Sequence, residues 1–419
     1  MTLVIAVSFA LFVFSPVWWP EIGADSRDLY AAATLLARGG DPYDPAQQFA
    51  QEDRLYNQAP HPHAYAHATY GYPPLFTRAL SLASGAGEPA FYLGSLAVLL
   101  AASLIAFKLL VDQLGADRHR LTATVFFLAA PPTVLSLFVG NPSPLLLVFW
   151  AAAVVLMLRD HNFIAGVAVS LTLIKLPVGL PVSVALLLAG PTTMQDAGVF
   201  ASSRLTALKA AVRPRAGAVG GFALGAAGLL GLDILLDGLR PLRSWTEALS
   251  GYGSALQPGA ASSAFAQSGL SGLPALLLGT WGATAATVLA CLVVLPLALW
   301  GALGLDRGRP HEARLAGIAL GVTAALSVSP YLHLNDLMLA ALPLLLLARL
   351  ASSWARFVLV GWFWLVPLRL VGVVILHDLT GYAPNTRSTA GVGVLFTAAT
   401  LAAVVLLCRH PERLSPGQR

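Results

Sequence analysis

The sequence predicts an all-α polytopic membrane protein, and three observations lead to that class. Hydrophobic residues make up 57% of the chain and charged residues only 11%, whereas a soluble protein is about half apolar and about a quarter charged. The mean hydropathy is +0.73. The apolar residues also fall in long runs separated by polar loops, which is the pattern of membrane-spanning helices.

About twelve membrane segments are predicted, and the whole chain, 1–419, is expected to form a single integral membrane domain. The first apolar run has no basic n-region and no clear small-residue cleavage site, so we interpret it as a retained span and not as a cleaved signal peptide. The predicted segments are residues 3–20, 90–111, 121–139, 144–158, 163–174, 177–190, 217–236, 281–304, 315–329, 335–348, 357–376 and 390–407.

Alternation of these segments sorts the loops into two sets of unequal positive charge. One set carries 16 of the 25 Lys and Arg residues, and the other carries 8. The positive-inside rule places the richer set in the cytoplasm, together with both termini. The long loops at 21–89 and 237–280 then face outward across a plasma membrane. We therefore interpret the net charge of +5 as an orientation signal, and expect no nucleic-acid partner.

The first polar segment, residues 24–43, is predicted to be a short amphipathic helix at the membrane surface. Apolar residues at helical spacing give it one apolar face, and Gly39 and Gly40 end it. Asp25 and Asp28 lie near its start. Either carboxylate can serve as a general base, and the alternative for Asp25 is that it only caps the helix.

Residues 163–174 and 177–190 are each too short to cross the membrane, since about 12 residues of helix reach only about 18 Å against a hydrocarbon core of about 30 Å. Both flanks belong to the cytoplasmic set of loops, so the pair is predicted to form a hairpin with Lys175 at its tip. A lysine at membrane depth usually faces a cavity that holds an anionic partner. The alternative is that Lys175 snorkels to the interface as an anchor.

Further polar residues are predicted to share the outward side with Asp25 and Lys175. His333 and Asp336 are three apart, so they share a face if that segment is helical. Carboxylates beside cations suit the removal of a proton from a hydroxyl and the binding of a departing phosphate. The predicted phosphate-binding cations are Lys175, His333, Arg240, Arg243 and Arg387.

Other site classes find little support in the sequence. No GxxxxGKS, GxSxG or HExxH motif is present, which argues against a nucleotide loop, a serine hydrolase elbow and a zinc protease. The two cysteines lie in apolar runs and form no CxxC pair. His61, His63 and His67 are loosely spaced, and metal sites need defined geometry. We therefore assign no metal and no cofactor.

Five motifs occur in an order that resembles glycosyltransferase family 87, a family of integral-membrane GT-C enzymes that use polyprenyl-phosphate sugars and include α-1,2-mannosyltransferases of actinobacterial envelopes. The resemblance runs from about residue 25 to 350. The motifs are the segment from Asp25 to Tyr43, YGYPPL at 70–75, GNPSPLL at 140–146, IKLP at 174–177 and SPYLHLNDL at 329–337.

The resemblance implies a GT-C-type helical bundle whose long extracytoplasmic loops carry amphipathic helices. It also implies transfer of a sugar, mannose or another hexose or pentose, from a polyprenyl-phosphate donor to a hydroxyl of a glycolipid or glycan acceptor. Asp25 matches the family's base better than Asp28 does. The aromatic pair of YGYPPL has an alternative role as an interfacial anchor. The expected substrate contacts are Tyr30, Tyr43, Tyr70, Tyr72, Asn141 and Asp336.

A transporter or flippase of a lipid-linked or anionic solute is the alternative function. It would use the same cations for binding, and the short hairpin is similar to the broken helices of transporters. However, the two halves of the sequence show no internal repeat, and both long loops lie on one side. These two features favour an enzyme with an external site.

Overall fold

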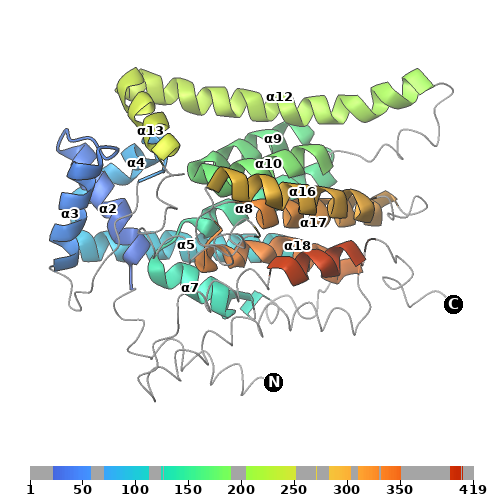
Figure 1. Cartoon of the computed structure of the whole chain (residues 1–419), viewed down its shortest axis with the longest axis horizontal. Helices are drawn as coiled ribbons and strands as arrows, with labels where there is room; N and C mark the ends of the chain where they lie inside the picture. Colours follow the sequence, from blue (N-terminus) through green and yellow to red (C-terminus); the bar gives the residue numbers. More distant parts are fainter. Residues whose placement is uncertain are drawn as a thin grey trace, which may run out of the picture.

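In the computed structural model, every regular element of the described residues is a helix (Figure 1). The predicted spans at 3–20 and 357–376 lie outside the described residues, and so does Arg387. The structure describes residues 22–57, 70–112, 124–125, 127–189, 204–251, 270, 283–302, 310–329, 332–350, 397–406 and 408.

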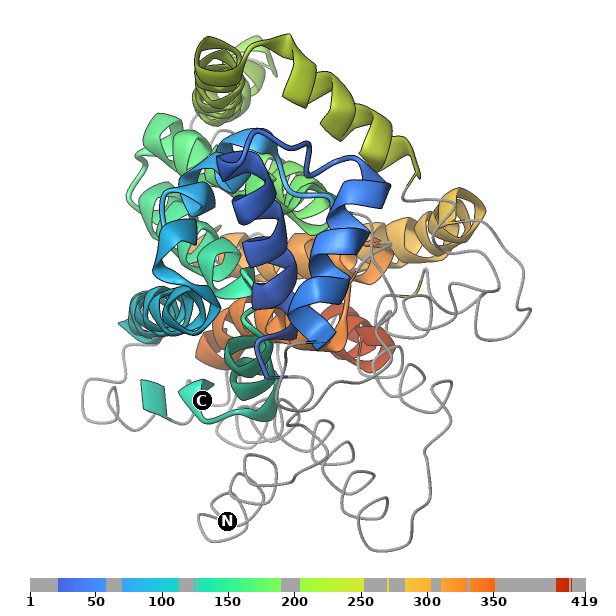
Figure 2. The same ribbon diagram turned by 90° about the vertical axis from the view of Figure 1, so that its left-hand side faces the viewer.

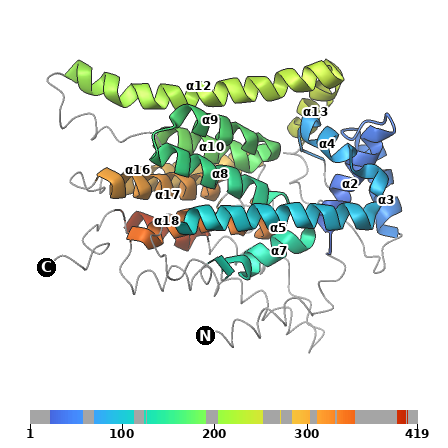
Figure 3. The ribbon, with the colours of Figure 1, turned by 180° about the vertical axis from the view of Figure 1, so that it is seen from behind.

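The helices run side by side in a bundle (Figures 1 and 3). Leu, Val and Ala from several helices fill its core around the buried Trp150, while other helix faces leave large apolar side chains exposed. Such faces suit contact with lipid. The helices of the bundle include α5 (Glu88–Asp112), α8 (Ser143–Leu158), α12 (Arg204–Asp237), α16 (Ala283–Ala302), α17 (Pro310–Val328) and α18 (Ala341–Leu350).

Three helical runs among the described residues are long and apolar enough to cross a membrane: Glu88–Asp112, Asn162–Ala189 and Arg215–Asp237. Shorter apolar helices at Ser143–Leu158 and Thr287–Gly301 accompany them. The protein is therefore a helical membrane protein, as predicted. The count of twelve segments stays a prediction.

The run Asn162–Ala189 consists of α9 (Asn162–Ser170), the 3₁₀ turn η4 (Leu171–Lys175) and α10 (Leu176–Ala189). By length and composition this run could cross the membrane once. The contacts within it, however, show that the chain turns back, so that the two arms lie side by side. Lys175 ends the turn between the two arms, as the hairpin prediction requires.

Three contacts establish the hairpin. The Thr172 and Ser183 hydroxyl oxygens lie 3.1 Å apart although the residues are eleven positions apart, a separation of about 16 Å along a straight helix. The far ends of the two arms also meet the same part of α12: Arg215 donates a hydrogen bond to the Leu188 carbonyl at 3.2 Å, and Gly217 lies against Asn162. The predicted hairpin is confirmed.

Gly179 permits the close approach of the two arms, because a Cβ atom at this position would lie 2.1 Å from the carbonyl oxygen of Thr172. We expect Gly179→Ala to lower the thermal unfolding temperature in detergent, since overpacking costs about 1–3 kcal/mol. The matched control is Gly220→Ala on α12, where an added Cβ meets nothing within 4 Å. It should be neutral or slightly stabilising. An equal fall in the unfolding temperature of both variants would contradict a specific need for glycine at position 179.

Four short helices gather at one end of the bundle (Figures 1 and 2). They are α2 (Ala24–Ala37), α3 (Pro45–Asn57), α4 (Pro74–Ser81) and α13 (Leu239–Gly251). The first three come from the loop predicted at 21–89, and α13 comes from the loop predicted at 237–280. Both long loops thus carry helices, and the two loops meet at the same end.

The opposite end of the bundle holds segments of the loop set that is richer in Lys and Arg and is predicted to be cytoplasmic. Arg314 at the start of α17 forms an ion pair with Asp160, with 3.5 Å between the guanidinium nitrogen and the carboxylate oxygen. Asp160 belongs to the turn between α8 and α9. This contact joins two loops that charge analysis places on the same side.

Candidate functional site

A connected set of polar side chains lies where α2 meets the bundle, and we call it the polar cluster. Its members come from four elements: α2, the turn between α7 (Pro131–Val139) and α8 with the start of α8, the hairpin turn η4, and the 3₁₀ helix η7 (Leu334–Ala340). The cluster consists of Asp25, Asn141, Ser143, Lys175 and Asp336.

Asn141 is the centre of the polar cluster. Its side-chain nitrogen donates a hydrogen bond to Asp25 Oδ2 at 2.6 Å. Its side-chain oxygen accepts from Lys175 Nζ at 3.3 Å and from the backbone N–H of Ser143 at 2.9 Å. Lys175 in turn forms an ion pair with Asp336. One chain of contacts therefore links the two carboxylates.

Asp336 is fully buried, and both of its carboxylate oxygens accept hydrogen bonds. One oxygen accepts from Lys175 and from the Ser143 hydroxyl, and the other accepts from the backbone N–H of His333 at 3.0 Å. Asp336 is thus the anionic partner predicted for Lys175. Its expected contact with substrate stays a prediction.

The start of α2 is held against the end of α7 by backbone contacts. The Gly23 N–H donates to the Phe138 carbonyl at 2.9 Å, and the Tyr92 hydroxyl donates to the same oxygen at 3.0 Å. Gly140 ends α7 at φ +77°, and a Cβ atom there would lie 2.7 Å from the Cβ of Ser26. Glycine at 140 thus lets α2 approach, which brings Asp25 to Asn141.

Asp25 lies in the first turn of α2 and does not cap it. The N-cap residue is Gly23, and no side chain caps the helix, so the capping alternative for Asp25 is wrong. Asp25 as a residue is half-buried. Burial raises the pKa of its carboxyl, against the lowering effects of Lys175 and of the Asn141 hydrogen bond. A raised pKa increases the basicity of a carboxylate that must take a proton near neutral pH.

The predicted tyrosines hold the YGYPPL segment in place. The Tyr43 hydroxyl donates to the Tyr72 carbonyl at 2.8 Å, and the Tyr70 hydroxyl pairs with Thr77 at 2.9 Å. The Trp245 indole of α13 donates to the Gly71 carbonyl at 3.0 Å. Tyr43 and Tyr70 are buried and pack in this segment, and their expected substrate contact stays a prediction.

The remaining predicted residues are more exposed. Tyr30 and Tyr72 are half-buried, with Tyr30 packed on Phe91 at a centroid distance of 5.2 Å. Arg240 and Arg243 are exposed on α13, on the side away from Trp245. The structure therefore does not bring these two arginines into the polar cluster.

Sequence reasoning missed two contributors to the site. Ser143 belongs to the GNPSPLL motif. It directly precedes the span predicted at 144–158, and a serine at that place was the signal that the sequence offered. The ion pair between Arg27 and Glu88, at 2.7 Å, joins α2 to the start of α5, and no spacing in the sequence indicates it.

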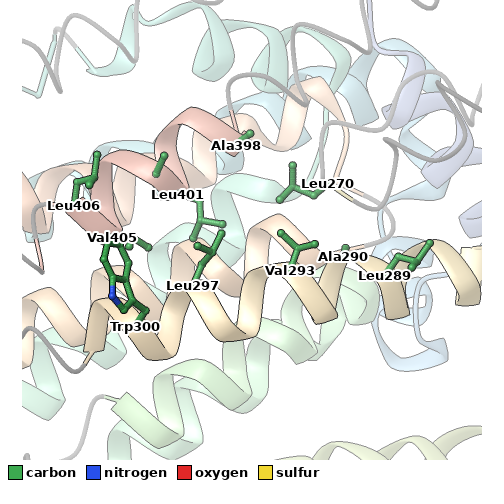
Figure 4. Close-up of a pocket in the computed structure, with 11 residues that line it drawn as sticks. Leu270, Leu289, Ala290, Val293, Leu297, Trp300, Ala398, Leu401, Val405 and Leu406 are labelled. Atoms are coloured by element: carbon green, nitrogen blue, oxygen red, sulfur yellow. The ribbon is translucent and has the colours of Figure 1, made fainter.

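The cavity drawn in Figure 4 lies between α16 and the helical segment 397–406 and has a volume of about 470 Å³. Leu, Val and Ala side chains line it, with Trp300 at one end. It contains no member of the polar cluster. A much smaller space of about 10 Å³ lies beside Asp336 and is bordered by Thr397 and Thr400.

Within the described ranges, no group of three His, Cys, Asp or Glu side chains is arranged to hold a metal ion. His61, His63 and His67 lie outside those ranges. The polar cluster itself offers the carboxyl group of the half-buried Asp25 beside the largely buried ammonium group of Lys175.

The fold and the polar cluster define a helical membrane protein with a carboxylate at one end of its bundle. A family model, Glycosyltransferase family 87, matches residues 70–330, which is more than half of the chain. The chain belongs to glycosyltransferase family 87 and is a membrane glycosyltransferase. The match includes Asn141 and Lys175. Comparisons with curated proteins and with solved structures give no match.

Proposed function

We propose that this glycosyltransferase moves a sugar, mannose or another hexose or pentose, from a polyprenyl-phosphate donor to a hydroxyl of a glycolipid or glycan acceptor on the extracytoplasmic side. The observation that carries the proposal is the placement of Asp25. Asp25 is half-buried at the end of the bundle where the two long loops meet, and Asn141 holds its carboxylate at 2.6 Å.

In the proposed reaction, Asp25 removes the proton of the acceptor hydroxyl. The resulting oxygen attacks the anomeric carbon of the sugar, and a new glycosidic bond forms. The bond from that carbon to the phosphate oxygen breaks, and polyprenyl phosphate leaves with the electron pair. A single base and an in-line leaving group are sufficient for this transfer with inversion.

Lys175 is proposed to bind the donor phosphate while it remains paired with Asp336. An ammonium group has three N–H donors, and Asn141 and Asp336 accept two of them. The third is proposed to bind a phosphate oxygen of the donor and to stabilise the charge that develops there. The partly buried His333 lies close enough to lower the pKa of Asp25, and it adds a further donor.

Arg240 and Arg243 are proposed to act during donor capture, before the sugar is transferred. Arg240 and Arg243 present two cations on the outer face of α13, where they attract an anionic lipid headgroup to this end of the bundle. The phosphate-binding role expected of Arg387, which lies outside the described residues, stays a prediction. Tyr30 and Tyr72, which are half-buried, are the proposed aromatic contacts of the sugar.

The test is transfer of radiolabelled sugar from a polyprenyl-phosphate donor to an acceptor glycan in membranes that contain the protein. We expect transfer without added nucleotide sugar. Transfer that requires a nucleotide sugar and ignores the lipid-linked donor would overturn the proposed donor class.

The proposed orientation is tested with cysteine labelling in a Cys291→Ala, Cys408→Ala background. Asp53→Cys on α3 and Arg159→Cys after α8 both replace exposed side chains. An impermeant maleimide added to intact cells should label Asp53→Cys, and should reach Arg159→Cys only after permeabilisation. The reverse pattern would place the polar cluster on the cytoplasmic side.

A further inference from the structure

We propose that Asn141 is a positioning residue that aims the Asp25 carboxylate and sets its affinity for a proton. This inference rests on the proposed role of Asp25 as the general base. It assigns Asn141 a function that acts through Asp25, in place of the substrate contact expected from the sequence, because only 2% of Asn141 is exposed.

The contacts of Asn141 leave its amide only one favourable orientation. The two groups around its oxygen are the Lys175 ammonium and the backbone N–H of Ser143, and both can only donate hydrogen bonds. A flipped amide would place its NH₂ group against two donors. The amide nitrogen must therefore face Asp25, to which it donates at 2.6 Å.

The backbone holds this amide in place. Gly140, with φ +77°, turns the chain directly before Asn141, and the Asn141 N–H donates to the Ser136 carbonyl at 2.9 Å. The Asn141 side chain is enclosed on both sides, by Asp25 and by the start of α8. A fixed donor restricts rotation of the Asp25 carboxylate about its own bond, and precise placement of a base is worth a large part of its effect.

The same hydrogen bond favours the ionised form of Asp25. Lys175 and His333 act in the same direction, whereas burial and Asp336 raise the pKa of Asp25. On α2 itself, Arg27 is paired with Glu88 of α5, and Asp28 is the nearest other acid. Removal of the Asn141 donor should therefore raise the pKa of Asp25 and move the acid limb of the rate profile to higher pH.

The experiment measures kcat/KM against pH for Asn141→Ala, Asn141→Asp and the wild type. Asn141→Ala should move the acid limb up by about one pH unit, since a hydrogen bond to a charged group is worth that much or more. Asn141→Asp keeps the shape of the side chain and the acceptor for Ser143 and Lys175. It replaces the amide donor by a carboxylate oxygen and adds a negative charge beside Asp25, so it should move the limb further in the same direction.

The control is Ser183→Ala, which removes a buried hydrogen bond with Thr172 elsewhere in the hairpin and should leave the acid limb at its wild-type position. Asn141 variants with reduced activity and an unmoved acid limb would overturn the positioning role and leave the role of Asp25 intact. Wild-type turnover in Asp25→Asn would instead refute the proposed function. If Asn141→Ala does not fold, the isosteric Asn141→Asp still decides the question.

Discussion

Asp25→Asn is expected to lower sugar transfer by a factor of about 10² to 10⁴, the usual contribution of a positioned acid–base group. Asparagine keeps the size of the side chain but cannot take a proton from the acceptor hydroxyl. Protein yield and donor binding should change little, because Asp25 does not cap α2. The measurement is transfer of radiolabelled sugar in membranes at matched expression.

Asp28→Asn is the matched control for this substitution. Asp28 lies three residues further along α2, so it can share a face with Asp25, but it is Asp25 that Asn141 binds. We expect Asp28→Asn to reduce transfer far less. An inactive Asp28→Asn beside an active Asp25→Asn would move the base to Asp28, and two active variants would leave the proposed reaction without its base.

Lys175→Ala is expected to abolish donor use and also to destabilise the protein. It leaves Asp336 buried without its cation, and breaking a buried ion pair in this way costs about 3–5 kcal/mol. Lys175→Arg keeps a positive charge with different geometry, so it should retain part of the activity. Both effects are measured on protein purified in detergent, by thermal unfolding and by binding of a polyprenyl-phosphate donor.

The double variant Lys175→Ala, Asp336→Ala separates binding from stability. It removes both charges, so it should recover much of the stability that Lys175→Ala loses. Donor binding should stay lost if Lys175 holds the phosphate. Recovery of donor binding together with stability, or wild-type activity in Lys175→Ala, would reduce Lys175 to a structural anchor.

Local patterns in the sequence were sufficient for the helical class, the amphipathic helix at 24–37 and the hairpin with Lys175 at its tip. Each of these depends on neighbouring residues: apolar spacing, glycine at the helix end, and two arms shorter than a membrane. The anionic partner of Lys175 could be expected from the cost of a buried charge. Its identity as Asp336 depends on packing between distant segments, which no local pattern encodes.

The positions of Arg240 and Arg243 show what a count of charges leaves open. Both were predicted to bind the donor phosphate directly, but α13 packs through Trp245 and leaves the two arginines outward. The spacing of Leu242, Trp245 and Leu249 along α13 already describes a single apolar face. Arg240 and Arg243 are not part of this apolar face, so they lie on the opposite side of the helix.

The polar cluster also bears on how the protein is made. Three of its contacts join residues that are 116, 161 and 193 positions apart, so these three cannot form from a local segment. Contacts of such long range are slow to form because the intervening chain must first be ordered. During synthesis, Asp25 leaves the ribosome long before Asp336, and the cluster must wait for the later helices. Under the proposed function, catalytic competence is acquired late in biogenesis, and an active molecule reports that the early and late segments have already assembled.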